Sequence, residues 1–395
     1  MMKTDIPANN ILTIESVAYG GDGVGRLSSG KVCFVPGTLP GEKVTVEIVQ
    51  EKKSFSRGRV LSIITPSPDR ITPECELSGS CPGCVYLHAS YEAELRFKES
   101  QLADFLIRSG VADGEVLKKI FPSPGRFGTR NKIKLNCRNG RCGYIAADNV
   151  SLLPVDGCLL AQCGINKTIP RIKTDGDGSV TFRITERNGV VVFRDGEKVS
   201  DRNWLTEVLP GAGEFKVPVD GFFQTNIPVA AELVRRVVES IRRSGKKRLI
   251  ELYCGVGVFS IAAAEEIADL QSVGIELDKK AVRAAKFNAS KHNVSKRCRF
   301  YAGDAGKLFE GLPDKKEALL LLDPPRGGLS GQTLQAVIKS GAERVIYISC
   351  APDTLRRDLT ALCQAGWRVT GAGALDMFPC TGHFETVAEL EYRGE

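Results

Sequence analysis

From about residue 219 onward, apolar runs of strand length alternate with runs of helical periodicity. The pattern predicts strands at 248–252, 272–277, 299–301, 318–322 and 345–348, and helices at 258–268, 279–292, 331–340 and 352–365. Two closing strands are expected near 367–375 and 386–392. Strands that alternate with helices pair in parallel, with helices on both faces of the sheet. We therefore expect an α/β fold, with a Rossmann-like domain over 219–395.

A glycine turn follows the first of these strands and opens the first helix. It reads Glu-Leu-Tyr-Cys-Gly-Val-Gly over 251–257. Its glycines let a ligand approach the backbone, and Glu276, at the end of the next strand, suits a pair of ribose hydroxyls. The third glycine of a pyrophosphate cradle is replaced by Ser260, which favours S-adenosylmethionine over NAD. The alternative is a tight turn with Glu276 on the surface.

Two more carboxylates follow strands of the same domain. Asp304 comes after the third strand, where it could reach the edge of an adenine. Asp323-Pro-Pro-Arg326 ends the fourth strand, and a rigid Asp-Pro-Pro there would point a carboxylate or a carbonyl at a reaction centre. The alternative is that these residues only terminate the strand.

A cysteine and a glutamate complete this set. Ser349-Cys350-Ala-Pro352 ends the fifth strand just before a helix, whose N-terminus is expected to lower the pKa of the thiol. His383-Phe-Glu385 precedes the last strand and offers a base. The alternatives are a buried structural cysteine and a surface glutamate. Methylation of a pyrimidine at C5 requires a thiolate to add to C6, a methyl donor and a base for the C5 proton, so it would use both residues.

The first 65 residues predict a small β-barrel, because several short strands rich in Val and Ile are separated by glycine turns. Lys52 to Arg59 is expected to be a basic loop with one aromatic residue, which suits RNA or is an ordinary solvated loop. Prolines at 66, 68 and 73 mark a linker.

Residues 74–218 are expected to form a central mixed α+β domain. A helix is predicted over 91–109, and an antiparallel sheet with Asn-Gly turns over 131–217. Cys75, Cys81 and Cys84 lie within ten residues and could bind one metal centre, either zinc or an iron–sulfur cluster. Spacing alone leaves the fourth ligand open among four later thiols, namely Cys137, Cys142, Cys158 and Cys163.

The overall charge is weakly positive. Lys and Arg total 54 and Asp and Glu 47, so the formal net charge is +7. Such a charge suits a nucleic-acid partner without requiring one. The longest aliphatic run, 318–322, is far shorter than the roughly 20 residues that span a bilayer, and no signal-peptide core follows Met1. We therefore expect a cytoplasmic protein that does not associate with membranes, and we expect it to be a monomer.

Taken together, the motifs resemble the RNA 5-methyluridine methyltransferase family, in its iron–sulfur, TRAM-domain branch. The resemblance covers nearly the whole chain. Its marks are Phe222-Phe223-Gln224-Thr-Asn226, Asp323-Pro-Pro-Arg-Gly-Gly-Leu329, Ser349-Cys350-Ala-Pro352 and His383-Phe-Glu385-Thr-Val387. It implies that Cys350 is the nucleophile and Glu385 the base, and that residues 1–65 are the TRAM barrel.

The resemblance also implies the binding residues. Those implied for S-adenosylmethionine are Gln224, Tyr253, Glu276, Asp304 and Asp323. A [4Fe–4S] cluster is implied on Cys75, Cys81, Cys84 and Cys158, because the family places the last ligand about 74 residues after the third, which selects Cys158 over Cys163.

We therefore predict an S-adenosylmethionine-dependent RNA uracil-C5 methyltransferase, most similar to the enzymes that modify 23S rRNA. The target base would leave its stack to meet Cys350, and Phe222 and Phe223 would either stack on it or pack in the core. Methylation of the tRNA T-loop is the alternative within this class. The alternatives from other classes are an NAD-dependent oxidoreductase with an iron–sulfur centre and a non-catalytic RNA-binding module.

Overall fold

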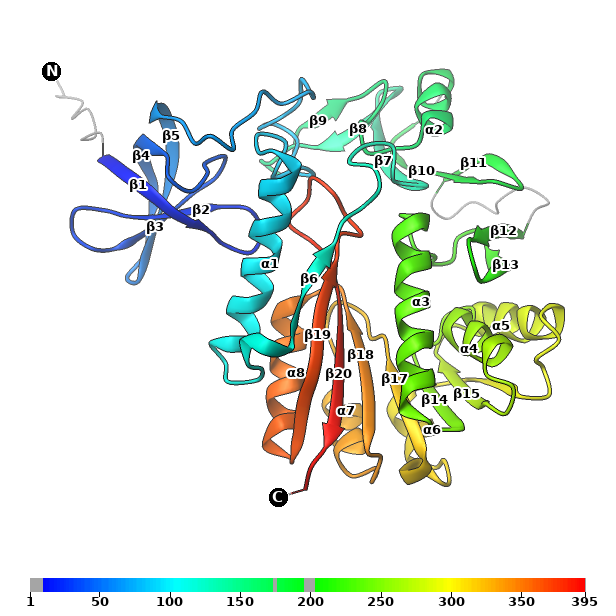
Figure 1. Ribbon diagram of the computed structural model, residues 1–395. Helices are drawn as coiled ribbons and strands as arrows, with labels where there is room; N and C mark the ends of the chain where they lie inside the picture. Colours follow the sequence, from blue (N-terminus) through cyan, green and yellow to red (C-terminus); the bar gives the residue numbers. More distant parts are fainter. Residues whose placement is uncertain (1–9, 173–175, 195–202, 395) are drawn as a thin grey trace, which may run out of the picture. The chain divides into compact units, whose positions relative to one another are not determined.

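The computed structural model describes residues 10–172, 176–194 and 203–394, which divide into two compact units (Figure 1). The first unit comprises residues 1–101, 144–153 and 378–383. The second comprises residues 102–143, 154–377 and 384–395. These units do not follow the expected boundaries at 65, 74 and 219, because the predicted central segment contributes chain to both.

The first unit begins with a closed five-stranded barrel. Its strands are β1 (Asn10–Val17), β2 (Gly23–Arg26), β3 (Val32–Val35), β4 (Lys43–Glu51) and β5 (Phe55–Thr65), in the order β1-β2-β3-β5-β4. Alternate residues of each strand point inward, so that Leu12, Ile14, Val44 and Val46 meet in one apolar core. The small barrel expected from the first 65 residues is confirmed.

The basic loop expected at 52–59 is shorter than predicted. Strand β4 ends at Glu51 and β5 begins at Phe55, so only residues 52–54 form the turn. Arg57 and Arg59 lie in β5, where they form ion pairs with Asp22 and Glu47. The predicted loop was too long because cross-strand pairing of β5 with β4 outweighs the weak strand propensity of Ser56 to Arg59.

A long helix follows the cysteine-rich segment. Helix α1 (Tyr91–Ile107) confirms the helix expected over 91–109. Within the described ranges, no helix is both long and apolar enough to cross a bilayer.

The second unit is built on an eight-stranded sheet in the order β16-β15-β14-β17-β18-β20-β19-β6. Strands β16 to β18 pair in parallel, and β20 is antiparallel to both β18 and β19. Figure 1 shows α3, α4 and α5 on one side of this sheet and α7 and α8 on the other. The predicted Rossmann-like arrangement is confirmed. The strands are β6 (Leu117–Phe121), β14 (Arg248–Leu252), β15 (Gln271–Glu276), β16 (Cys298–Ala302), β17 (Ala318–Leu322), β18 (Arg344–Ser349), β19 (Trp367–Leu375) and β20 (Glu385–Tyr392); the helices are α3 (Ile227–Ser244), α4 (Val258–Glu266), α5 (Lys279–Lys291), α6 (Ala305–Glu310), α7 (Gly331–Ile338) and α8 (Pro352–Gln364).

Helices α3 and α6 and strand β6 of this unit were not predicted. Helix α3 buries Val229, Leu233, Val237 and Ile241 at four-residue spacing, so its helical period was present in the sequence. Helix α6 has only six residues, too few for a period to appear. Strand β6 joins the sheet edge in parallel with β19, far along the chain, a pairing that local sequence does not encode.

Residues 131–218 form two small antiparallel sheets rather than the single one expected. One has the order β11-β10-β7-β8-β9, and the other is the hairpin β12-β13. The Asn-Gly turn at 139–140 joins β7 to β8 with positive φ at both residues, as its composition predicts. Asn288 of α5 binds the backbone N–H and carbonyl of Lys216 and so ties the hairpin to that helix. The strands are β7 (Lys132–Arg138), β8 (Arg141–Ile145), β9 (Leu152–Pro154), β10 (Gly178–Thr185), β11 (Gly189–Arg194), β12 (Trp204–Leu209) and β13 (Gly213–Pro218), and the short helix α2 (Cys163–Thr168) lies between β9 and β10.

Candidate active site

The glycine turn lies where β14 ends and α4 begins. Tyr253 and Gly257 both have positive φ, at 66° and 86°. An added Cβ at Gly257 would lie 2.8 Å from the ring of Phe300, so this position requires glycine. The backbone N–H groups of Tyr253 and Cys254 both donate to the carbonyl of Ile275, which ties the turn to the neighbouring strand β15.

Glu276, the last residue of β15, is bound to this turn. One carboxylate oxygen accepts a hydrogen bond from the Gly255 N–H at 3.1 Å, and the other accepts one from the Asp278 N–H at 2.9 Å. The half-buried carboxylate therefore lies beside the turn rather than on the open surface, as a ribose-binding residue requires.

A cleft opens in front of the turn and encloses about 550 Å³ of space, part of it open to solvent. Gln224, Tyr253 and Asp323, three of the five predicted cofactor residues, line it. Most of the other lining residues are apolar or aromatic, and none of the described lining residues is Lys, Arg or His. The cleft therefore suits a ligand with apolar parts and a positive charge.

Two carboxyl groups line this cleft with raised pKa values. Burial and the charge of Glu276 together raise the pKa of Asp323 to about 7. Glu251 is buried, and this raises its pKa to about 8, although the Ser260 N–H and hydroxyl both donate to its Oε2. A cation in the cleft would favour the ionised forms and lower both pKa values.

No role was predicted for Glu251 from the sequence. It begins the glycine motif, and Ser260 was noted only for the glycine that it replaces. The sequence did hold one signal for this contact, because Glu251 precedes Ser260 by nine residues across a turn from a strand to a helix. The structure shows that Ser260 serves to bind this carboxylate.

Asp304 does not line the cleft. It is the N-cap of α6, and its exposed carboxylate accepts a hydrogen bond from the Lys307 N–H at 3.0 Å. Stabilising the end of its own helix therefore accounts for an aspartate at this position.

Cys350 and Glu385 lie at the same end of the neighbouring strands β18 and β20, one just after β18 and the other at the start of β20. In the antiparallel pair of β18 and β20, Ser349 is the partner of Thr386. Cys350 is one residue beyond Ser349, just past the end of β18, and Glu385 is one residue before Thr386; the charge of Glu385 acts on the Cys350 thiol. The structure thus brings together two residues that are 35 positions apart in the chain.

The expectation that the helix N-terminus lowers the pKa of Cys350 is wrong. Burial, together with the charges of Glu385 and Asp323, raises the pKa of this thiol to about 11, while Arg326 opposes them. The pKa of Glu385 is also well above its usual range, because the side chain is buried and Asp323 lies nearby. Desolvation and two neighbouring carboxylates outweigh the partial charge of one helix end.

Asp323 connects this pair to the cleft. It follows β17, where its N–H donates to the carbonyl of Leu252 at the end of β14. Its side chain lines the cleft, and its charge acts on both Cys350 and Glu385. The cleft and the Cys350–Glu385 pair therefore lie at the same end of the sheet, where the parallel strands have their carboxyl ends.

The segment that carries Gln224 is anchored by a buried arginine. Arg183 of β10 donates to the carbonyls of Pro218, Val219 and Gly221 at 3.0–3.4 Å and forms an ion pair with buried Glu207 at 2.7 Å. Farther along the segment, Phe222 is 72% exposed and Phe223 only 6% exposed. Of the two phenylalanines expected either to stack or to pack, Phe223 packs and Phe222 faces solvent.

Replacing Arg183 by Met is expected to reduce the free energy of unfolding by about 3–5 kcal/mol, because Glu207 and three carbonyls lose their buried partner. Urea unfolding would measure the loss. A second substitution, Glu207→Leu, should recover stability without recovering cofactor affinity, since the carbonyls at 218–221 remain unanchored. Cofactor affinity equal to wild type in the Arg183→Met variant would contradict the anchoring role.

The predicted cluster cysteines fall in both units. Cys75, Cys81 and Cys84 belong to the first unit, where the Cys81 N–H donates to the carbonyl of Leu77. Cys158 belongs to the second unit, and its backbone N–H and carbonyl are both bound by the Asn166 amide. Over residues 10–172, 176–194 and 203–394, no group of three or more His, Cys, Asp or Glu side chains is placed to hold a metal ion.

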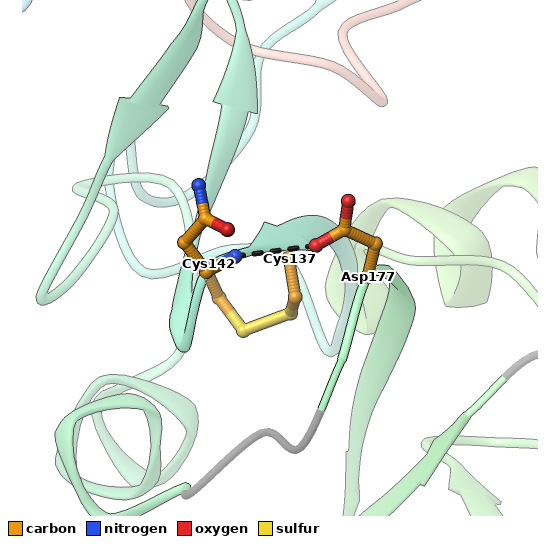
Figure 2. The surroundings of a disulfide bond; sticks show 4 residues. Cys137, Cys142 and Asp177 are labelled. Carbon is orange, nitrogen blue, oxygen red and sulfur yellow. Dashed lines mark hydrogen bonds between the residues drawn. A yellow bond between two sulfur atoms is a disulfide. The ribbon is translucent and has the colours of Figure 1, made fainter.

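Two of the thiols considered for the fourth ligand are joined to each other. Cys137 and Cys142 form a disulfide across the β7–β8 hairpin, and the turn between them donates from the Asn139 N–H to Asp177 (Figure 2). Cys158 and Cys163 remain free thiols. The choice of a fourth ligand is thereby reduced to these two residues.

Comparison with known proteins gives two family matches and several relatives. Residues 12–61 match the TRAM domain, and residues 190–303 and 311–393 match the tRNA (uracil-5-)-methyltransferase family. An uncharacterized RNA methyltransferase of Thermosynechococcus vestitus is 30% identical over 96% of this chain and 97% of its own. One of Aquifex aeolicus is 30% identical over 97% and 98%.

A solved structure has the same fold. The tRNA (uracil-54, C5)-methyltransferase of Pyrococcus abyssi, in complex with S-adenosyl-L-homocysteine, superposes with a TM-score of 0.74 at 24% identity, over 96% of this chain and 99% of its own. None of these three proteins is named as an oxidoreductase. The matches along nearly the whole chain, together with a cleft suited to a cationic ligand, establish that this protein belongs to the S-adenosylmethionine-dependent RNA (uracil-5-)-methyltransferase family.

Proposed function

We propose that this chain transfers a methyl group from S-adenosylmethionine to C5 of a uridine in RNA, with Cys350 as nucleophile and Glu385 as base. The observation that carries the proposal is the proximity of the two residues, because Cys350 follows the last residue of β18, Glu385 precedes its partner in β20, and the charge of Glu385 acts on the Cys350 thiol. Asp323, which lines the cofactor cleft, acts on both of them.

The chemistry explains why both residues are needed. Carbon C5 of uracil is a poor nucleophile until a thiolate adds to C6 and converts C5 and the C4 carbonyl into an enolate. Cys350 supplies that thiolate. Because burial raises the pKa of Cys350 to about 11, the thiol must lose its proton as it adds, and O4 of the uracil accepts that proton. The proton leaves O4 for solvent when C5 takes the methyl group. S-adenosylmethionine, when bound, supplies the methyl group that C5 receives.

Glu385 then completes the reaction. After methyl transfer, C5 carries both a hydrogen and a methyl group, and the Glu385 carboxylate accepts the C5 proton. The electron pair of that C–H bond re-forms the C5–C6 double bond, and the Cys350 thiolate leaves from C6. The raised pKa of Glu385 suits a base that must hold a proton during turnover.

The residues present fit S-adenosylmethionine. Glu276 would hold the ribose hydroxyls, and Gln224, Tyr253 and Asp323 would hold the rest of the ligand in the cleft. We also propose that Asp304 contacts the adenine, although its carboxylate caps α6. The absence of lysine and arginine from the described cleft lining suits a sulfonium.

For the RNA target we propose 23S rRNA, on the resemblance of the sequence to enzymes of that kind, with Lys52 and Lys53 of the barrel turn contributing to RNA binding. The second candidate is tRNA, which the names of the matching family and of the Pyrococcus abyssi structure favour. In both RNAs the base must leave its stack to reach the pair.

Methyl transfer from radiolabelled S-adenosylmethionine into separate unmodified 23S rRNA and tRNA transcripts would test this. Nucleoside analysis should recover the label as 5-methyluridine from one RNA. Label in tRNA alone would replace the rRNA proposal, and label in another nucleoside would overturn the assigned chemistry. A cytoplasmic location and a monomeric state remain part of the proposal.

The iron–sulfur cluster is also proposed, on cysteine spacing and resemblance alone. Protein purified without oxygen is expected to contain about four iron and four sulfide ions per chain, as one [4Fe–4S] cluster requires. Cys158→Ala should lose the iron, and Cys163→Ala, the matched control, should keep it. Iron-free protein with full methyl transfer would remove the cluster from the proposal.

A further inference from the structure

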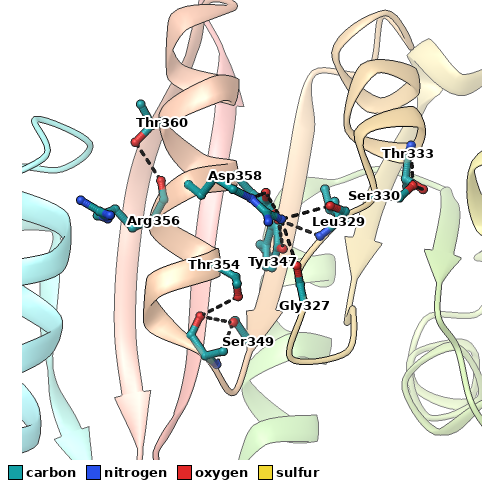
Figure 3. A network of polar contacts seen from close by, with 12 residues as sticks. Gly327, Leu329, Ser330, Thr333, Tyr347, Ser349, Thr354, Arg356, Asp358 and Thr360 are labelled. Atoms are coloured by element: carbon teal, nitrogen blue, oxygen red, sulfur yellow. Dashed lines mark hydrogen bonds and ion pairs between the residues drawn. The ribbon is translucent and has the colours of Figure 1, made fainter. Parts of the chain in front are cut away.

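The loop that follows Asp323-Pro-Pro is held by the first turns of α8. The central residue of this contact is Asp358 of α8, whose carboxylate is fully buried. Its Oδ2 accepts hydrogen bonds from the Leu329 N–H at 2.8 Å and from the Tyr347 hydroxyl at 2.6 Å (Figure 3). Asp358 therefore joins the loop over 326–329, the helix α8 and the strand β18.

Neighbouring residues of α8 bind the carbonyls of the same loop. Arg357 forms an ion pair with Asp358 at 2.8 Å and donates to the carbonyls of Gly327 and Leu329, each at 3.0 Å. The Thr354 hydroxyl donates to the carbonyl of Arg326, also at 3.0 Å. Three residues of this helix, Thr354, Arg357 and Asp358, thus fix the backbone of the loop.

Gly328 shows how closely the loop approaches the helix. Its φ is +72°, and an added Cβ would lie 2.6 Å from Arg357 Nη2 and 2.7 Å from Asp358 Oδ2. Its N–H also donates to the carbonyl of Pro325, which closes a turn around Arg326 and Gly327. Glycine is required here both by backbone conformation and by space.

The same helix sets the position of Cys350. Helix α8 begins at Pro352, two residues after Cys350. The residues on either side of Cys350 are also joined, because the Ser349 hydroxyl binds the backbone N–H and carbonyl of Ala351. Cys350 and Arg326 are therefore attached to one rigid element. The charged groups that act on Cys350 are Glu385 from β20, and Asp323 and Arg326 from the segment that follows β17.

We propose that Asp358 is a positioning residue, which holds Arg326 in place beside the Cys350–Glu385 pair through the loop over 326–329. Arg326 is the positive group that acts on this pair, and its position determines how well the thiolate of Cys350 is stabilised. The importance of the Arg326 position for catalysis rests on the proposed function, but the effect of Arg326 on the Cys350 thiol does not.

The test measures the rate at which iodoacetamide alkylates Cys350 as a function of pH, resolved by peptide mass spectrometry in the protein without RNA. If Asp358→Asn displaces Arg326, the alkylation rate at neutral pH should fall by about threefold to tenfold, because a nearby positive charge lowers the pKa of a thiol. Arg326→Gln should cause the same fall. Asp358→Asn added to Arg326→Gln should cause no further fall.

Methyl-transfer kinetics provide a second readout. Asp358→Asn should lower kcat by about tenfold to a hundredfold, as small displacements of positioned groups do, and leave the affinity for S-adenosylhomocysteine unchanged. If the chain does not methylate uridine, the alkylation profile still tests the positioning role by itself.

Two milder variants cover the case in which Asp358→Asn does not fold. Thr354→Val removes the hydroxyl that binds the Arg326 and Ala351 carbonyls, and Thr360→Val is its control, because Thr360 binds the Arg356 carbonyl within the same helix. Thr354→Val should slow alkylation of Cys350, and Thr360→Val should not. An unchanged alkylation profile in every folded variant, whatever the change in Tm, would overturn the proposal.

Discussion

Cys350→Ala is expected to abolish methyl transfer and to leave RNA binding nearly intact. Without the thiol, no group can add to C6, so C5 never becomes nucleophilic, and loss of such a residue costs about 10⁴-fold or more in rate. Binding is retained because Cys350 is a single small side chain at the edge of the sheet. Radiolabel incorporation and filter binding of the same RNA would measure the two effects separately.

Cys363→Ala is the matched control. This cysteine lies in α8, and burial raises the pKa of its thiol as well, but the thiol contacts the carbonyl of Val111 and does not face Glu385. Its removal should leave the rate close to that of wild type. Substantial methyl transfer by Cys350→Ala would sink the proposed mechanism.

Glu385→Gln is expected to lower turnover by about 10²- to 10⁴-fold and to trap RNA on the protein. The amide cannot accept the C5 proton, so the methylated base cannot expel Cys350 from C6. A covalent complex of RNA and protein should therefore accumulate, and it should survive denaturing electrophoresis. Its yield should depend on S-adenosylmethionine and vanish in the Cys350→Ala, Glu385→Gln double variant.

Glu389→Gln is the control on the same strand. Glu389 lies farther along β20, where it pairs with Ile346 of β18 and forms an ion pair with Arg243 at 2.8 Å. Its replacement should affect neither turnover nor trapping. If Glu385→Gln released product at the wild-type rate, another group would have to serve as the base.

Much of the fold was predictable because its signals are local. Every strand and helix expected between 248 and 392 is present, since each has its own apolar run or helical period. The edge strand β6 was not predictable, because its partner β19 lies more than two hundred residues later. The division into two compact units was also missed, because it depends on contacts between distant segments.

The site shows the same distinction between local and distant information. Gln224, Tyr253 and Asp323 line the cleft as their motifs predicted, whereas Asp304 caps its own helix. Glu251 was missed because its bonds to Ser260 form only once the strand and the helix pack together.

The sequence by itself determined which chemical groups are present and which lie at strand ends, because both depend on neighbours in the chain. It specified a thiol and a glycine turn that each follow a strand, and a carboxylate that precedes one. Only the tertiary structure decided that Cys350 lies near Glu385, because the pairing of β18 with β20 across the sheet brings the ends of these strands together. The pKa of Cys350 likewise lies above its usual range rather than below it, because burial and the charges of Glu385 and Asp323 depend on the folded surroundings and outweigh the local helix end.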